Sequence, residues 1–130
     1  MADQLAIAVR RQWEDEAALR RLNDPYPLPV RWEPANAGLV EDWASLVRLA
    51  TAGAGWPAPP SPGTWATGPA ELAGGDDELP GLLDRVPTGR LVILGEPGAG
   101  KTMLTVRLVL DLLAGRADGG PVPLLVPLAS

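Results

Sequence analysis

Apolar residues near the start of the chain recur at three- and four-residue spacing, a pattern typical of helices that bury one face. Between Asp3 and Leu22 they are Leu5, Ala6, Val9, Trp13 and Ala17, with charged residues at many of the positions between them. Asp3 can cap this helix, and Pro25 favours its end because the residue before a proline avoids the helical region. A second amphipathic helix is expected from Ala37 to about Ala50. We expect each helix to pack one face on the chain itself or on a partner.

Three prolines at alternate positions follow the first helical pattern and favour an extended path. Leu28, Val30 and Trp32 then share one face. This apolar stripe favours a segment laid on the chain's own hydrophobic surface. The alternative is a ligand for a proline-recognising domain.

Glycine and proline dominate residues 53–75, where they occupy eleven of 23 positions. Such a stretch buries too little to offset its ordering entropy, so we expect it to be mobile, with Trp56 and Trp65 weakly docked. We therefore divide the chain into a helical leader with a proline-rich extended segment (1–52), a flexible linker (53–78) and a C-terminal domain (79–130).

The C-terminal domain shows short apolar runs on either side of a helix, the pattern of a parallel α/β sheet. Arg90–Leu94 is a β-branched run typical of a buried strand. Val122–Leu128 predicts a second strand, in which two prolines favour an edge position. Between them, the residues from Met103 to Leu113 predict a helix that is apolar on nearly all sides, so that we expect other parts of the protein to cover it. Gly115 is expected to end this helix. A short helix from Pro80 to about Val86 precedes the first strand.

Composition and charge exclude several classes of function. The 130 residues carry a net charge of −5 with scattered arginines, so we expect no nucleic-acid partner and no membrane partner. The chain has no cysteine and no histidine, which argues against disulfides and transition-metal sites and is compatible with a reducing cytoplasm. The first residues lack the pattern of a secretory signal. We expect a cytoplasmic protein.

The expected strand at Arg90–Leu94 leads directly into Gly95-Glu96-Pro97-Gly98-Ala99-Gly100-Lys101-Thr102, which matches the phosphate-binding pattern G-x-x-x-x-G-K-[ST]. Gly95, Gly98 and Gly100 permit backbone angles that other residues avoid, so that successive N–H groups can surround an anion at a helix N-terminus. The bland alternative is a glycine-rich turn with a solvated lysine.

Two side chains of this loop have expected roles toward a nucleoside triphosphate. Lys101 offers a compact ammonium to the β- and γ-phosphates, and the Thr102 hydroxyl offers one ligand to magnesium. Lys101 is the only lysine in the chain, beside ten arginines. The single lysine thus stands where a point charge fits between phosphates better than a planar guanidinium does.

Arg90–Ser130, with its phosphate loop and leucine-rich helix, resembles the start of an actinobacterial NACHT-domain NTPase, a STAND-class P-loop ATPase. The segments Arg10–Trp13 and Asn23–Trp32 are similar to the region before that module. The resemblance implies a P-loop α/β fold and a signal-transducing switch that binds ATP and magnesium and self-assembles or binds a signalling partner. Gly95, Gly100, Lys101 and Thr102 would be its phosphate and magnesium contacts.

The chain departs from this family in one respect. Hydrolysis requires an acid at the end of another strand, yet after Thr102 the acids are Asp111, in mid-helix, and Asp118, in a turn. We expect the N-terminal part of a longer protein or a truncated reading frame, inactive as an enzyme by itself. The predicted fold is an incomplete P-loop NTPase parallel sheet (strand, phosphate loop, helix, strand) after a helical leader and a linker. The alternative function is a non-catalytic interaction fragment with a vestigial phosphate loop; a small-molecule kinase is disfavoured because 94 residues precede the loop.

Overall fold

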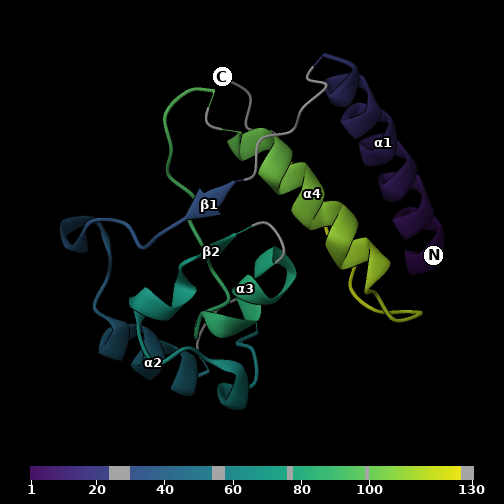
Figure 1. Cartoon of the computed structure of the whole chain (residues 1–130). Coiled ribbons are helices and arrows are strands. Elements are labelled where there is room, and N and C mark those ends of the chain that lie inside the picture. The colour runs from purple at the N-terminus through teal and green to yellow at the C-terminus, as the bar shows by residue number, and fades with distance from the viewer. Residues whose placement is uncertain (24–29, 54–57, 76–77, 99, 127–130) are drawn as a thin grey trace. The chain divides into compact units, whose positions relative to one another are not determined.

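The computed structural model describes residues 1–23, 30–53, 58–75, 78–98 and 100–126, without the side chains of residues 20–23. The chain divides into two compact units. Unit 1 combines Met1–Leu28 with Pro97–Ser130, and unit 2 is the continuous stretch Pro29–Glu96. The elements of each unit are labelled in Figure 1.

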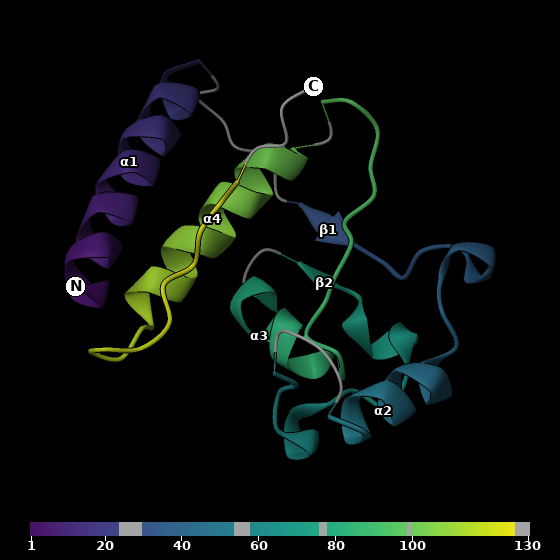
Figure 2. The same cartoon turned by 180° about the vertical axis from the view of Figure 1, so that it is seen from behind.

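Unit 1 is built on two helices, α1 (Ala2–Asn23) and α4 (Lys101–Ala114), which lie side by side in opposite directions (Figures 1 and 2). Their contact buries small and branched aliphatic side chains. The small ones let the two helices approach closely. The core consists of Ala6, Val9, Val109 and Leu113, with Trp13, Val122 and Leu125 packed against it. The chain therefore joins its first helix to the helix that follows the phosphate-binding motif.

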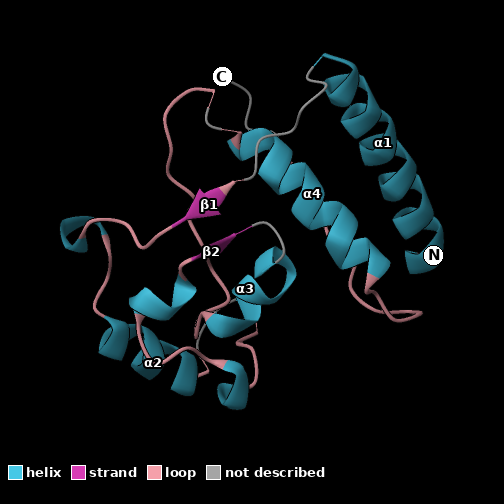
Figure 3. Cartoon of the chain, viewed as in Figure 1, coloured by secondary structure: helices cyan, strands magenta, loops and turns pink. Residues whose placement is uncertain are grey.

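Unit 2 consists of short helices and a two-stranded sheet joined by long loops (Figure 3). Its helices are η1 (Ala37–Leu39), α2 (Trp43–Thr51), η2 (Pro62–Thr64), η3 (Pro69–Leu72) and α3 (Leu79–Arg85). Strands β1 (Arg31–Trp32) and β2 (Gly74–Gly75) pair antiparallel. The buried side chains are small or aliphatic: Ala50, Ala66, Leu79, Leu82, Val86 and Pro87.

The periodic patterns predicted the helices well. The helices expected at the start of the chain and after the phosphate-binding motif are confirmed as α1 and α4, and the short helix expected near Pro80 is α3. The second helix begins later than predicted, at Trp43. Before it, the Asn36 side chain accepts a hydrogen bond from the Gly38 N–H at 3.1 Å, which starts a short 3₁₀ turn, and Val40 is extended.

The predicted parallel strands are not formed in the described residues, whose strands are β1 and β2 alone. Residues 91–96 and 121–126 are irregular there. A parallel strand is held by hydrogen bonds to a neighbouring strand, and several apolar side chains expected inside a sheet instead face solvent, with Val92 80% and Val126 72% exposed. The expected P-loop NTPase sheet therefore stays a prediction.

The expected linker has a more definite structure than its composition suggested. Unit 2 includes it, and the Ala66 N–H donates to the Arg85 carbonyl of α3 at 2.9 Å. Thr64 Oγ1 donates to the Asp84 carbonyl at 2.9 Å, and Trp65 Nε1 donates to the Pro60 carbonyl at 3.0 Å. The division at residues 52 and 78 thus differs from the boundaries of the compact units. Trp56 lies outside the described residues.

No helix in the described part of the chain combines the length and apolar character needed to cross a bilayer.

Candidate phosphate-binding site

The motif Gly95–Thr102 spans the boundary between the units, which falls between Glu96 and Pro97. In unit 2, Gly95 and Glu96 are exposed and irregular. In unit 1, Pro97 and Gly98 form an exposed turn, Gly100 precedes α4, and Lys101 is the first residue of that helix. Ala99 lies outside the described residues.

Two glycines of the motif adopt left-handed backbone angles directly before α4. The φ angle is +82° at Gly98 and +90° at Gly100. No heavy atom lies within 4 Å of the position that a Cβ would occupy at Gly98, so its conformation, not its space, requires glycine. The Gly100 carbonyl accepts the Leu104 N–H at 2.9 Å and begins the helical hydrogen bonds. Gly100 thus passes from a left-handed conformation directly into the helix.

The first turn of α4 presents donors at its N-terminus. The N-cap residue Gly100 has no side chain that could accept a hydrogen bond from the helix. The first N–H groups of any α-helix also lack intrahelical acceptors. They carry the positive end of the helix dipole. Lys101 is half-buried and Thr102 is exposed. The Lys101 carbonyl is part of the helix, where it accepts the Thr105 hydroxyl at 2.8 Å.

The residues fit a phosphate better than they fit a magnesium ion alone. Thr102 contributes one hydroxyl, and within the described ranges no group of three or more His, Cys, Asp or Glu side chains comes together. Asp111 lies about 15 Å further along α4, at 1.5 Å per residue, and its carboxylate is 4.0 Å from Nε of Arg107. Magnesium commonly takes most of its ligands from phosphates and water, so Thr102 would serve it only together with a bound phosphate.

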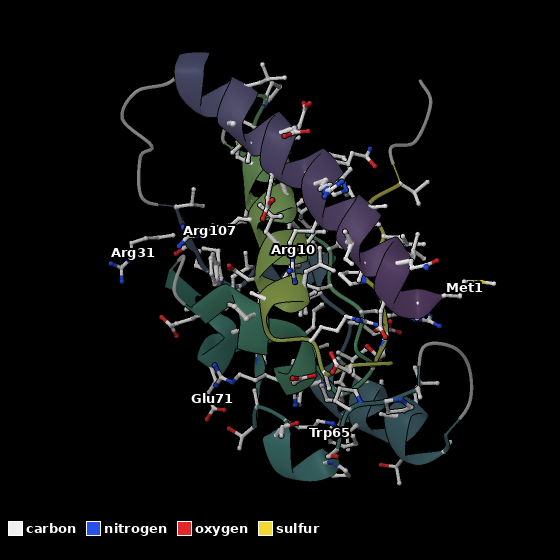
Figure 4. The ribbon with its side chains drawn as sticks, turned by 90° about the vertical axis from the view of Figure 1, so that its right-hand side faces the viewer. Met1, Arg10, Arg31, Trp65, Glu71 and Arg107 are labelled. Atoms are coloured by element: carbon white, nitrogen blue, oxygen red, sulfur yellow. The ribbon has the colours of Figure 1, made fainter. Side chains whose placement is uncertain are left out.

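The structure shows one contact of α4 that the sequence did not identify: α1 packs against it, at the end of α4 opposite the motif. Arg10 lies at the contact between α1 and α4 (Figure 4), and its Nη2 donates to the Leu113 carbonyl at 2.9 Å. This carbonyl belongs to the last turn of α4, where intrahelical donors run out. The period of the apolar residues in α1 showed that one face was buried but could not show against what.

Comparisons of the chain with protein-family models, with curated proteins and with solved structures found no match.

Proposed function

We propose that this chain binds the phosphates of a nucleoside triphosphate, ATP, through Gly95–Thr102. One observation carries the proposal: two glycines with positive φ directly precede a helix whose first residue is the only lysine of the chain. Positive φ turns backbone N–H groups toward a common centre, and the helix dipole favours an anion there.

Different groups of the loop would bind different parts of the nucleotide. Backbone N–H groups around Gly98 and Gly100 and in the first turn of α4 hold phosphate oxygens, and the Lys101 ammonium neutralises them. The Thr102 hydroxyl would hold magnesium, which supplies positive charge that screens neighbouring phosphates. Lys101 is half-buried, which limits the positions that its ammonium can take.

We further propose that the chain is part of a cytoplasmic NACHT-type ATPase switch with a P-loop α/β fold, which self-assembles or engages a signalling partner. The phosphate loop and the similarity of Arg10–Trp13 and Asn23–Trp32 to the family's leader support this assignment. A non-catalytic interaction fragment is the competing function, and it requires no nucleotide affinity.

Equilibrium binding of a fluorescent ATP analogue in the presence of magnesium tests the proposal. Lys101→Ala should abolish binding, and Lys101→Arg should weaken it, because a guanidinium does not reproduce the compact ammonium. Arg107→Ala is the matched control, since it removes an exposed cation from the same helix away from the loop. Circular dichroism verifies that each variant is folded. Equal binding by the wild type and folded Lys101→Ala would overturn the proposal, and a wild type that does not bind would favour the interaction fragment.

A further inference from the structure

Different parts of the chain lie at the two ends of α4. Its N-terminus carries the proposed phosphate loop, and beyond its C-terminus Arg116 and Gly119 contact Asp3 in the first turn of α1. Nη1 of Arg116 donates to Oδ1 of Asp3 at 2.8 Å, and the Gly119 N–H donates to the same oxygen at 3.0 Å. We call Asp3, Arg116 and Gly119 the latch.

The latch involves a nearly buried charge. The Arg116 side chain is 9% exposed, whereas that of Asp3 is 60% exposed. Nε of Arg116 donates to the carbonyls of Gly120 and Pro121, at 2.9 and 3.1 Å, which fixes the guanidinium in the connection after α4. Nη2 of Arg116 is buried and has no hydrogen-bond partner in the described part of the chain. A buried charge of this kind is costly when its partner is removed, so α1 is held where Asp3 can reach Arg116.

Helix α4 depends on the helix that the latch holds. Its 14 residues are close to the limit below which an isolated helix is marginal in water. Its side chains at Val109 and Leu113 are 5% and 1% exposed and share a core with Ala6 and Val9 of α1. Undocking of α1 would expose this apolar face and weaken α4. The phosphate loop converges on the first turn of α4, so its N–H groups are preorganised only while α4 is formed.

We propose that docking of α1 through the latch and phosphate binding at the opposite end of α4 are energetically linked, so that each favours the other. This inference rests on the proposed function. Linkage requires reciprocity: if docking of α1 raises affinity for ATP, bound ATP must stabilise docked α1 by the same factor. A displaced α1 would therefore lower nucleotide affinity, which makes the leader helix a regulatory element of the site.

Two measurements on the full chain test the linkage. Hydrogen exchange followed by mass spectrometry reports opening of α1, with and without saturating magnesium ATP. We expect ATP to slow exchange in α1, and Lys101→Ala to abolish that slowing. Equilibrium binding should show that Asp3→Ala weakens ATP binding roughly 5-fold or more, the lower end of typical coupling.

Matched variants separate the latch from a general effect on α1. Asp15→Ala removes an exposed acid from the same helix and should leave ATP affinity unchanged. Asp3→Asn keeps an acceptor for Gly119 but loses the charge, and it should weaken binding less than Asp3→Ala; it also serves if Asp3→Ala does not fold.

The outcomes distinguish the two proposals. Slowed exchange together with weaker binding by the Asp3 variants supports the linkage. If ATP binds but exchange in α1 is unchanged, or if Asp3→Ala and Asp15→Ala bind ATP equally, the linkage is overturned and the phosphate site stands. If the wild type binds no ATP, both fall.

Discussion

Nη1 of Arg116 donates to the carboxylate of Asp3 at 2.8 Å, across 113 positions of the sequence. The pair is asymmetric, because the arginine is almost buried and the aspartate is largely exposed. Losing the aspartate leaves a buried cation without its counter-charge, whereas losing the arginine leaves an acid that water can solvate.

This asymmetry predicts unequal effects of the two truncations. Asp3→Ala should lower the midpoint of thermal unfolding more than Arg116→Met, because methionine fills much of the same space without a charge. Differential scanning calorimetry at neutral pH measures both midpoints. A larger loss for Arg116→Met would show that its hydrogen bonds to the Gly120 and Pro121 carbonyls matter more than its charge.

The same pair predicts a pH dependence. The N–H of Gly119 and then the guanidinium of Arg116 hold the pKa of Asp3 below its ordinary value of 3.8. The pKa of Asp3 is lower in the folded protein than in the unfolded chain. Asp3 therefore stabilises unit 1 at pH values above its unfolded pKa, and this contribution is lost as the pH falls through the folded pKa. Thermal midpoints of the wild type and Asp3→Asn should therefore differ at pH 7 and converge as the pH falls below 3.8 and through the lowered folded pKa of Asp3.

Other carboxylates titrate in both proteins and cancel in this comparison. Glu71 is an example: the N–H and the hydroxyl of Thr67 hold its pKa below the ordinary value in both proteins. A difference between wild type and Asp3→Asn that stays constant from pH 7 to pH 2 would contradict the prediction.

The contact of α1 with α4 should depend on Leu113, which is 1% exposed. Leu113→Ala should destabilise unit 1 by about 2–5 kcal/mol, through lost burial and the cavity left behind. Urea unfolding measures this loss. Leu124→Ala is the control at a 61% exposed leucine and should change the free energy of unfolding by less than about 0.5 kcal/mol. Equal effects of the two substitutions would mean that the α1–α4 core contributes little.

Unit 2 offers a test of the glycine- and proline-rich stretch. Nε1 of Trp32 donates to the Leu72 carbonyl at 2.7 Å, which ties β1 to η3. Trp32→Phe keeps a ring but removes this bond and should cost about 0.5–1.5 kcal/mol. We expect first proteolytic cleavage within residues 53–75. Cleavage there should be faster in Trp32→Phe than in the control variant Trp43→Phe, which changes another half-buried tryptophan. First cuts within α4 would contradict this expectation.

We also expect the chain to bind magnesium ATP without hydrolysing it. The loop provides N–H groups, one ammonium and one hydroxyl, which can hold a ground state, whereas catalysis needs groups that act on the transition state. Among the described acids beyond the loop, Asp111 lies well along α4 and Asp118 is exposed in the turn after it. Phosphate release over hours should match that of Lys101→Ala; a clearly faster rate would reveal an acid supplied from elsewhere.

The sequence predicted local structure better than it predicted partners. Apolar period identified α1, α3 and α4 because this signal acts within a few residues. The expected cap was wrong: Asp3 lies inside α1, and its carboxylate accepts hydrogen bonds from Arg116 and Gly119. The same patterns could not show that Val9 packs beside Leu113, since period reveals a buried face but not what covers it. Composition was also a poor guide to residues 58–75, where backbone hydrogen bonds such as that from Ala66 to Arg85 depend on long-range geometry.

The backbone conformation at the candidate site was predictable in part, whereas the assignment of its residues to phosphate binding stays a prediction. Of the three glycines expected to use unusual backbone angles, Gly98 and Gly100 have positive φ and Gly95 does not. Helix α4 begins at Lys101, directly after this turn. The runs at 90–94 and 122–128 predicted strands on hydrophobicity alone. Strand formation requires a hydrogen-bonded neighbour, which an apolar run does not specify.

Unit 1 joins two segments that are far apart in the sequence, Met1–Leu28 and Pro97–Ser130, and this affects the order in which the units fold during synthesis. Helix α1 leaves the ribosome before its partner α4, which begins only at Lys101, 78 residues after α1 ends at Asn23. At about 5–20 residues per second, α1 waits roughly 4–16 s for the side chains that cover it. Unit 2, a continuous stretch, can fold within that interval. Throughout it, Ala6 and Val9 of α1 lack the side chains of Val109 and Leu113 that bury them in the folded unit.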